Sequence, residues 1–160
     1  MTLRRPTTDG PAGEAPASPP PIAAKQTGDA AEHLVAGMMT LAGMPTFKAP
    51  ENWPAYDLIA QPPHNGTPQR ISVKSRRESD THKLQLVLTP PDDWDWFAFV
   101  WIPKGNERPY IWLIPKEVAL PGSGPYARGV RHVTWGKLNG EYKRFEDNFT
   151  LLRDGKRAGS

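Results

Sequence analysis

Apolar residues recur at helical spacing between residues 29 and 43. The positions are Ala31, Leu34, Val35, Met38, Leu41 and Ala42. This spacing predicts an amphipathic helix with one buried face. Asp29 is a suitable N-cap, and Glu32 stands three residues later, as in a capping box. Gly43 is expected to end the helix, because glycine readily adopts the left-handed conformation that follows many helices.

Two extended segments follow, joined by a stretch rich in turn-forming residues. Residues 55–59 read Ala-Tyr-Asp-Leu-Ile and residues 71–75 read Ile-Ser-Val-Lys-Ser, which is typical of strands. The intervening Asn65-Gly66 is the strongest hairpin signal in the chain. We therefore predict two antiparallel strands, preceded by a shorter strand over residues 46–49.

The segment from Trp94 to Ile102 is apolar on both faces, which is typical of a central strand covered on both sides. Residues 110–114 form a second apolar run and are predicted to be its hairpin partner. Residues 83–89 alternate in polarity and suit a half-buried strand, which Pro90-Pro91-Asp92-Asp93 should end. We assign the aromatic side chains to the core rather than to base stacking, because aromatics alternating within strands are usually buried.

Three short elements are predicted near the C-terminus. Pro115 should start one helical turn over residues 115–120. Residues 132–135 suit a short edge strand, and residues 143–152 suit a closing helix, in which Phe145, Phe149 and Leu152 fall on one face.

Length and composition set the domain boundaries. The chain has 160 residues, the usual size of one domain. Residues 1–27 are rich in proline and small residues and hold too little apolar surface to offset the entropy of ordering. We predict a disordered arm over 1–27, a folded domain over 28–152 and a flexible basic tail over 153–160.

The net charge of +3 comes from the two ends of the chain. Residues 28–154 hold 15 Lys and Arg against 15 Asp and Glu, so local charge is more informative than the total. One basic run contains no acidic residue. It comprises Arg70, Lys74, Arg76 and Arg77. A second basic run, between residues 128 and 144, is interpreted equally well as a solvated rim.

Composition also excludes several kinds of site. The chain has no cysteine, so disulfides and thiolate zinc sites are excluded. Its four histidines show no metal-ligand spacing. It has neither an apolar run long enough for a membrane span nor an apolar N-terminal segment. We therefore expect a cytoplasmic protein with no membrane partner.

Asp57 and Lys74 are the most informative residues. They place a carboxylate and an ammonium on neighbouring strands rich in Ile, Leu and Val, where a charge is costly unless it is paired or holds a metal. This pattern is typical of metal-assisted phosphodiester cleavage. The alternative is an ordinary cross-strand ion pair, worth less than about 1 kcal/mol when exposed. Ser72 and Ser75 are not expected to be nucleophiles, because no histidine stands beside them to act as a base.

The order of these elements, with Tyr-Asp-Leu-Ile and Ile-Ser-Val-Lys-Ser on adjacent strands, resembles the PD-(D/E)XK nuclease-like superfamily over about residues 28–152. It is most similar to small bacterial members related to Holliday-junction resolvases and homing endonucleases. The resemblance implies an α/β fold with a mixed central β-sheet flanked by helices, a restriction endonuclease-like αβββαβ core. It also implies DNA as partner and hydrolysis of phosphodiester bonds with Mg or Mn as cofactor.

The resemblance also assigns roles by position. Asp57 matches the metal-binding aspartate, Lys74 the motif lysine, and Glu32 the helix glutamate of many members. It implies a metal held by Asp57, Glu32 and the Val73 backbone carbonyl, with Ser72 as a weak ligand. Glu32 has an equally good alternative role in the capping box. The implied nucleic-acid contacts are Arg70, Ser75, Arg76 and Arg77.

Two positions depart from the family pattern. Tyr56 replaces a proline that is often replaced, whereas Ser72 stands where the family has an acidic residue or glutamine. A neutral hydroxyl is a weak Mg ligand, so the resemblance predicts loose metal binding or none. The first interpretation is therefore a metal-dependent DNA endonuclease, and the second is a catalytically lapsed module of the same fold that binds DNA or protein. A homodimer, as in many resolvases, and a protein partner for the N-terminal arm stay open.

Overall fold

The computed structural model describes residues 22–64, 66–78, 85–88, 93–105, 107–125 and 131–154. The predicted turn residue Asn65, residues 1–21 of the predicted arm and residues 155–160 of the predicted tail lie outside this part of the chain. So do residues 79–84 and 89–92, which include both ends of the strand predicted over residues 83–89.

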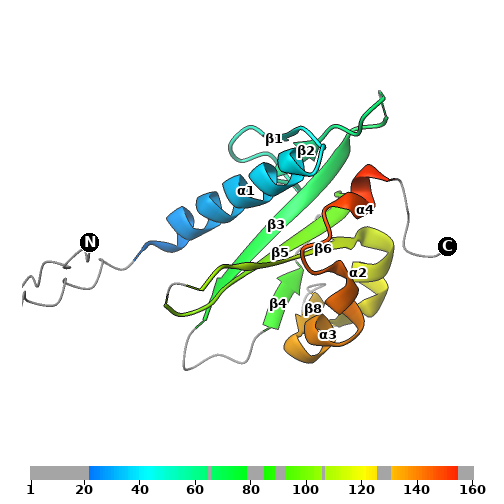
Figure 1. The fold of residues 1–160 in the computed structure, drawn as a ribbon. Helices are drawn as coiled ribbons and strands as arrows, with labels where there is room; N and C mark the ends of the chain where they lie inside the picture. Colours follow the sequence, from blue (N-terminus) through cyan, green and yellow to red (C-terminus); the bar gives the residue numbers. More distant parts are fainter. Residues whose placement is uncertain are drawn as a thin grey trace, which may run out of the picture.

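A five-stranded mixed sheet forms the centre of the fold (Figure 1). Its strands, in spatial order, are β1 (Thr46–Lys48), β2 (Leu58–Ala60), β3 (Gln69–Arg77), β5 (Trp96–Ile102) and β6 (Tyr110–Pro115). The first three strands are antiparallel neighbours, whereas β5 runs parallel to β3 and antiparallel to β6. The predicted mixed sheet and both predicted hairpins are confirmed.

A second sheet of three short strands has the order β4-β8-β7. Strand β4 (Gln85–Leu88) belongs to the connection between β3 and β5, where the αβββαβ pattern has a helix, and β7 spans Gly124–Pro125. Strand β8 (Arg131–Thr134) pairs with β4 on one side and with β7 on the other. The prediction of an edge strand at this position is therefore wrong, because β8 is the central strand of its sheet.

Helix α1 (Ala24–Leu41) lies along one face of the large sheet (Figure 1). It begins earlier than predicted, and the predicted capping box of Asp29 and Glu32 is wrong. The N-cap is Ala23, whose backbone N–H donates to the Gln26 side chain at 3.1 Å. The predicted end is confirmed, since Gly43 follows the helix with φ of +89°.

The large sheet separates two hydrophobic clusters. Ile71 and Val73 of β3 point toward α1 and pack with Val35 and Met39. The alternate positions of the neighbouring strands, such as Phe99, face a second cluster formed with the C-terminal elements. These elements are α2 (Lys116–Gly122), α3 (Trp135–Asn139) and the 3₁₀ helix η2 (Glu141–Phe145). Most of the aromatic residues of β5 and β6 are buried, as predicted.

The predicted closing helix over residues 143–152 is wrong. Helix η2 ends at Phe145, and α4 spans only Thr150–Arg153. Between them Glu146 forms a β-bridge with Trp112, and Asp147 has a positive φ of 51°. Phe145 packs in the second cluster and Phe149 in the first, so the chain must turn between them. No helix in the described ranges has the length and apolar character needed to cross a bilayer.

Candidate nuclease site

Asp57 lies where the chain enters β2. Its backbone N–H donates to the Ile71 carbonyl at 2.9 Å, and its Oδ2 accepts a hydrogen bond from the Val73 N–H at 2.6 Å. Backbone N–H groups of a strand lie in the plane of the sheet. The half-buried carboxylate therefore lies against the edge of β3, directly before the start of β2. It accepts the hydrogen bond that a backbone carbonyl of a longer β2 would accept.

Lys74 is the next residue along β3. It is exposed, and its parallel neighbour Phe99 belongs to the second cluster, so Lys74 projects from the face opposite α1. No ion pair joins it to Asp57, although the structure describes both residues. The ordinary ion-pair interpretation is therefore wrong. The two groups flank the same point of β3 without neutralising each other.

Glu32 extends from α1 toward the edge strand β1. Its Oε2 lies 3.0 Å from Lys48 Nζ, which also lies 3.6 Å from Asp29 Oδ1. The hydrogen bond with Glu32 raises the pKa of Lys48. Glu32 and Asp57 line one cleft of about 200 Å³, together with Lys48. The structure thus brings these two predicted acids together and adds a lysine that the sequence analysis did not single out.

Ser72 completes the predicted ligand set and is buried, with 5% of its surface exposed. It offers only a neutral hydroxyl, so the predicted ligand set has two carboxylates, each already engaged by one donor. The described residues contain no group of three His, Cys, Asp or Glu able to hold a metal. Mg is often bound through one or two carboxylates, with water and substrate phosphates completing its shell. The residues therefore fit a metal that binds together with a substrate phosphate and do not fit a closed, preformed centre.

The basic residues of β3 differ in how their charges are used. The side chains of Lys74, Arg76 and Arg77 are exposed and make no hydrogen bond or ion pair with any residue in the described ranges. Ser75 is half-buried on the face of α1. The second basic run is more fully paired, since Lys137 lies 3.0 Å from Glu141 and Lys143 lies 2.5 Å from Glu146.

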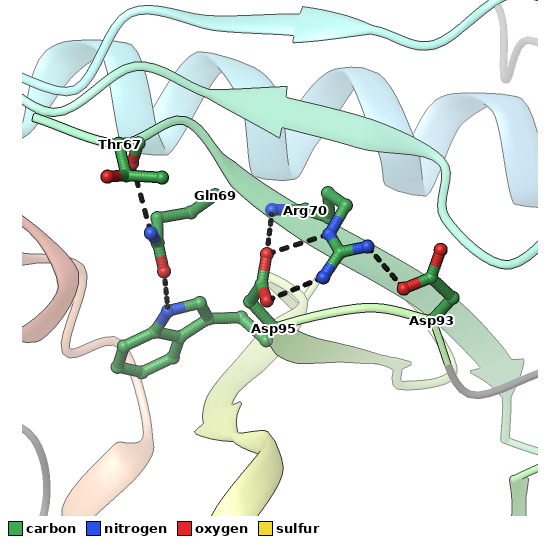
Figure 2. A network of polar contacts seen from close by, with 6 residues as sticks. Thr67, Gln69, Arg70, Asp93 and Asp95 are labelled. Carbon is green, nitrogen blue, oxygen red and sulfur yellow. Dashed lines mark hydrogen bonds and ion pairs between the residues drawn. The ribbon is translucent and has the colours of Figure 1, made fainter.

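Arg70 is held in a network of polar contacts (Figure 2). Its Nε and Nη2 each donate to the Asp95 carboxylate at 3.0 Å, its backbone N–H donates to Asp95 Oδ2 at 2.9 Å, and its Nη1 contacts Asp93. The hydrogen bond with Asp95 raises the pKa of Arg70. Burial raises the pKa of Asp95, but the hydrogen bonds from Arg70 outweigh it and leave that pKa below its ordinary value. Arg70 therefore joins β3 to the start of β5, and its charge is already engaged by two carboxylates.

Sequence reasoning missed Asp95 and Lys48 as partners of predicted site residues. Asp95 stands directly before a buried strand, a position that would have indicated a charge in need of a partner. Lys48 gave no comparable signal, because its contact with α1 depends on how the helix packs against the sheet.

Comparisons with known proteins support the nuclease-like fold. No protein-family profile and no curated protein sequence matches the chain. Among solved structures, the chain is similar to a bacterial homing endonuclease, I-Ssp6803I, with a TM-score of 0.59 and 15% identity, over 86% of this chain and 97% of the endonuclease. A second similar structure is the Holliday junction resolvase Hjc of Archaeoglobus fulgidus, at TM-score 0.45 and 15% identity, over 68% of this chain and 84% of the resolvase.

The sheet order and the helix on one face agree with the mixed α/β fold that the resemblance in the sequence implies. The chain shares its α/β fold with that homing endonuclease.

Proposed function

We propose that this protein is a metal-dependent DNA endonuclease that hydrolyses phosphodiester bonds at the β3 edge. One observation carries the proposal: the Asp57 carboxylate is fixed on the Val73 N–H, 2.6 Å away, and the next residue of β3, Lys74, is exposed and has no ion-pair partner among the described residues. A carboxylate and an ammonium held at successive residues of one strand suit a site that must receive both a cation and a phosphate.

The residues of β3 have two roles in this proposal, binding of the DNA backbone and stabilisation of the reacting phosphate. Arg76 and Arg77, with Ser75 as a hydrogen-bond donor, contact backbone phosphates, which gives binding without sequence readout. Lys74 places a positive charge against the phosphate that is cleaved. Its ammonium stabilises the negative charge that develops on the phosphoryl oxygens.

Asp57 would hold the Mg or Mn ion, with Glu32, the Val73 carbonyl and Ser72 as further oxygen donors. When bound, this ion supplies an acidified water and neutralises charge on the phosphoryl oxygens. Glu32 must then leave or share its ion pair with Lys48, which lowers the affinity of the site for metal. We therefore expect metal to bind with DNA and not before it.

The second candidate is a catalytically lapsed DNA-binding module of the same fold. The buried, neutral Ser72 and the Glu32–Lys48 ion pair at 3.0 Å favour it, because Ser72 offers no charge to a metal and Glu32 is already engaged by a cation. In this case β3 would bind DNA through the same cations but would not cleave it.

Incubation with labelled linear, branched and single-stranded DNA in Mg or Mn tests both proposals. We expect cleavage by the wild type, a loss of at least about 100-fold in Asp57→Asn and Lys74→Met, and unchanged cleavage in Lys137→Gln, whose ammonium is paired with Glu141. Binding without cleavage would establish the lapsed module. Absence of both binding and cleavage would refute both proposals. Sedimentation of the complex would show whether two copies act together.

A further inference from the structure

A second cleft, of about 340 Å³, opens where β5 ends and β6 begins. Its volume lies within the range of small-ligand sites. Four aromatic residues line it, from both of these strands and from α3. They are Trp101, Tyr110, Trp112 and Trp135. This cleft shares no lining residue with the cleft of Glu32 and Asp57.

The aromatic rings pack around the start of α3. The ring centre of Trp135 lies 5.6 Å from that of Trp101 and 5.8 Å from that of Trp112, the latter pair edge to face. Trp112 is fully buried, but Trp135 is 38% exposed, and Trp101 and Tyr110 are half-buried. The rings of the cluster therefore leave part of their surface exposed to the cleft and are not fully buried against one another.

Acidic residues surround these rings. Glu78, Glu107 and Glu146 line the cleft against a single cation, Lys143. Lys143 Nζ lies 2.5 Å from Glu146, whereas Glu78 accepts, from the described residues, a hydrogen bond from the neutral Lys104 backbone N–H at 2.8 Å. These side chains leave a net of two negative charges, which repels phosphate and favours a cation.

Two neighbouring groups refine this picture. Arg76, the parallel neighbour of Trp101 on β3, does not line the cleft and forms no ion pair with these carboxylates. Trp112 Nε1 is buried and has no hydrogen-bond acceptor in the described part of the chain. Leaving such a donor without an acceptor is costly, so a water or a ligand oxygen in the cleft would stabilise it.

We propose that this cleft binds an organic cation, a substituted ammonium or guanidinium group, between the aromatic rings and the carboxylates. Cations bind over the faces of tryptophan and tyrosine because the ring quadrupole attracts positive charge. The group belongs either to a free small molecule or to a lysine or arginine side chain of a partner. The proposal is independent of DNA cleavage, since it uses neither Asp57 nor Lys74.

The indole N–H signals of the ¹⁵N-labelled full chain report binding directly. Each of the six tryptophans gives one signal, which its own Trp→Phe variant assigns. We expect choline to shift the signals of Trp101, Trp112 and Trp135 in a saturable manner and to leave Trp53 unchanged. The neutral analogue 3,3-dimethyl-1-butanol and an equal concentration of NaCl should give no saturable shift. Comparison of choline with an arginine-containing peptide then distinguishes a free cation from a side chain.

Variants separate this site from a structural cluster. Trp135→Leu should weaken choline binding by about fivefold, the size of one cation–π contact at a partly exposed site. Glu107→Gln removes one of the carboxylates and should weaken it as well. Trp53→Leu and Glu117→Gln, at an exposed tryptophan and an acid of another cleft, should leave it unchanged. Equal binding of the neutral analogue, or no saturable shift by any cation, would overturn the proposal. So would selective shifts by single-stranded DNA, because the cleft would then stack bases.

Discussion

Replacing Arg76 and Arg77 with glutamine tests whether β3 contacts the DNA backbone. Both side chains are exposed at the end of β3 and, like Lys74, have no partner among the residues that the structure describes. Their charges are therefore free to neutralise phosphates. Glutamine keeps a polar side chain and removes the charge, so the double variant isolates the electrostatic part of binding.

The expected magnitude follows from the number of free cations. Each phosphate neutralised contributes about 0.9 to the slope of log affinity against log salt, so Lys74, Arg76 and Arg77 together contribute about 2.7. Between about 50 and 200 mM KCl these three contacts should weaken binding by about 40-fold. In the double variant Lys74 is the one remaining contact of these three, so the slope should be smaller by about 1.8. The same increase in salt should then weaken binding through this contact by about 3.5-fold.

Fluorescence anisotropy with a labelled duplex, measured without divalent metal over this range of salt, gives the slope. Lys137→Gln serves as the matched control, because its charge is already paired with Glu141 at 3.0 Å and its loss should leave the slope unchanged. An unchanged slope in the double variant would refute the assignment of β3 as the DNA-contacting strand. An equal change in the control would show that the effect reflects total charge.

Three further predictions concern the metal, the Arg70 network and the second cluster. Ser72→Glu supplies the missing carboxylate, so titration calorimetry should detect Mn binding without DNA; no added binding would contradict the proposed ligand set. Asp95→Asn should lower the free energy of unfolding in urea by about 2 kcal/mol at neutral pH, because Arg70 loses a charge-assisted partner. The pKa of Asp95 lies below its ordinary value of 3.8 in the fold, so this stability is present above that value and lost as pH falls toward the folded pKa; a difference from wild type that persists in strong acid would contradict this account. Tyr142 donates to the Val118 carbonyl at 3.0 Å, and burial raises its pKa to about 12; Tyr142→Phe should cost about 1 kcal/mol in the same titration, and no loss would show that the bond contributes nothing.

Strands were predicted well where their pattern was independent of distant neighbours. Residues 94–102 are apolar on both faces, and only a strand covered on both sides satisfies such a run. Turn-forming residues between β2 and β3 fixed their antiparallel pairing. The start of α1 was mistaken because Asp29 suits an N-cap, yet Ala24, Lys25 and Gln26 are good helix formers that extend the helix toward the N-terminus.

The C-terminal region was harder, because its structure depends on tertiary contacts. Phe145 and Phe149 have helical spacing, but they pack in clusters on opposite faces of the large sheet. Glu146 pairs with β6 between them, which no local pattern indicates. The place of β8 in its sheet was similarly ambiguous, since the sequence of a four-residue strand does not indicate whether it lies at the edge or at the centre of a sheet.

The roles of the candidate site residues stay predictions, whereas their contacts can be compared with the structure. Asp57 and Lys74 were predicted to lie on adjacent strands, and they lie directly before β2 and within β3. The ion pair that was their alternative role is absent, because the carboxylate accepts a hydrogen bond from a backbone N–H instead. The Arg70–Asp95 contact joins residues 25 positions apart. Such a partner becomes apparent only once the parallel pairing of β3 with β5 is known.

That parallel pairing also determines the stage of synthesis at which the proposed DNA-binding site can form. Strand β3 carries Lys74 and receives Asp57, yet its inner edge is completed only by β5, whose first paired residue, Trp96, comes 25 positions after Ile71. Contacts between residues so distant in sequence form late in folding. A ribosome-bound chain that ends before residue 102 already contains every residue of the proposed ligand set. It should still bind no DNA, because β5 has not yet completed the sheet beside β3.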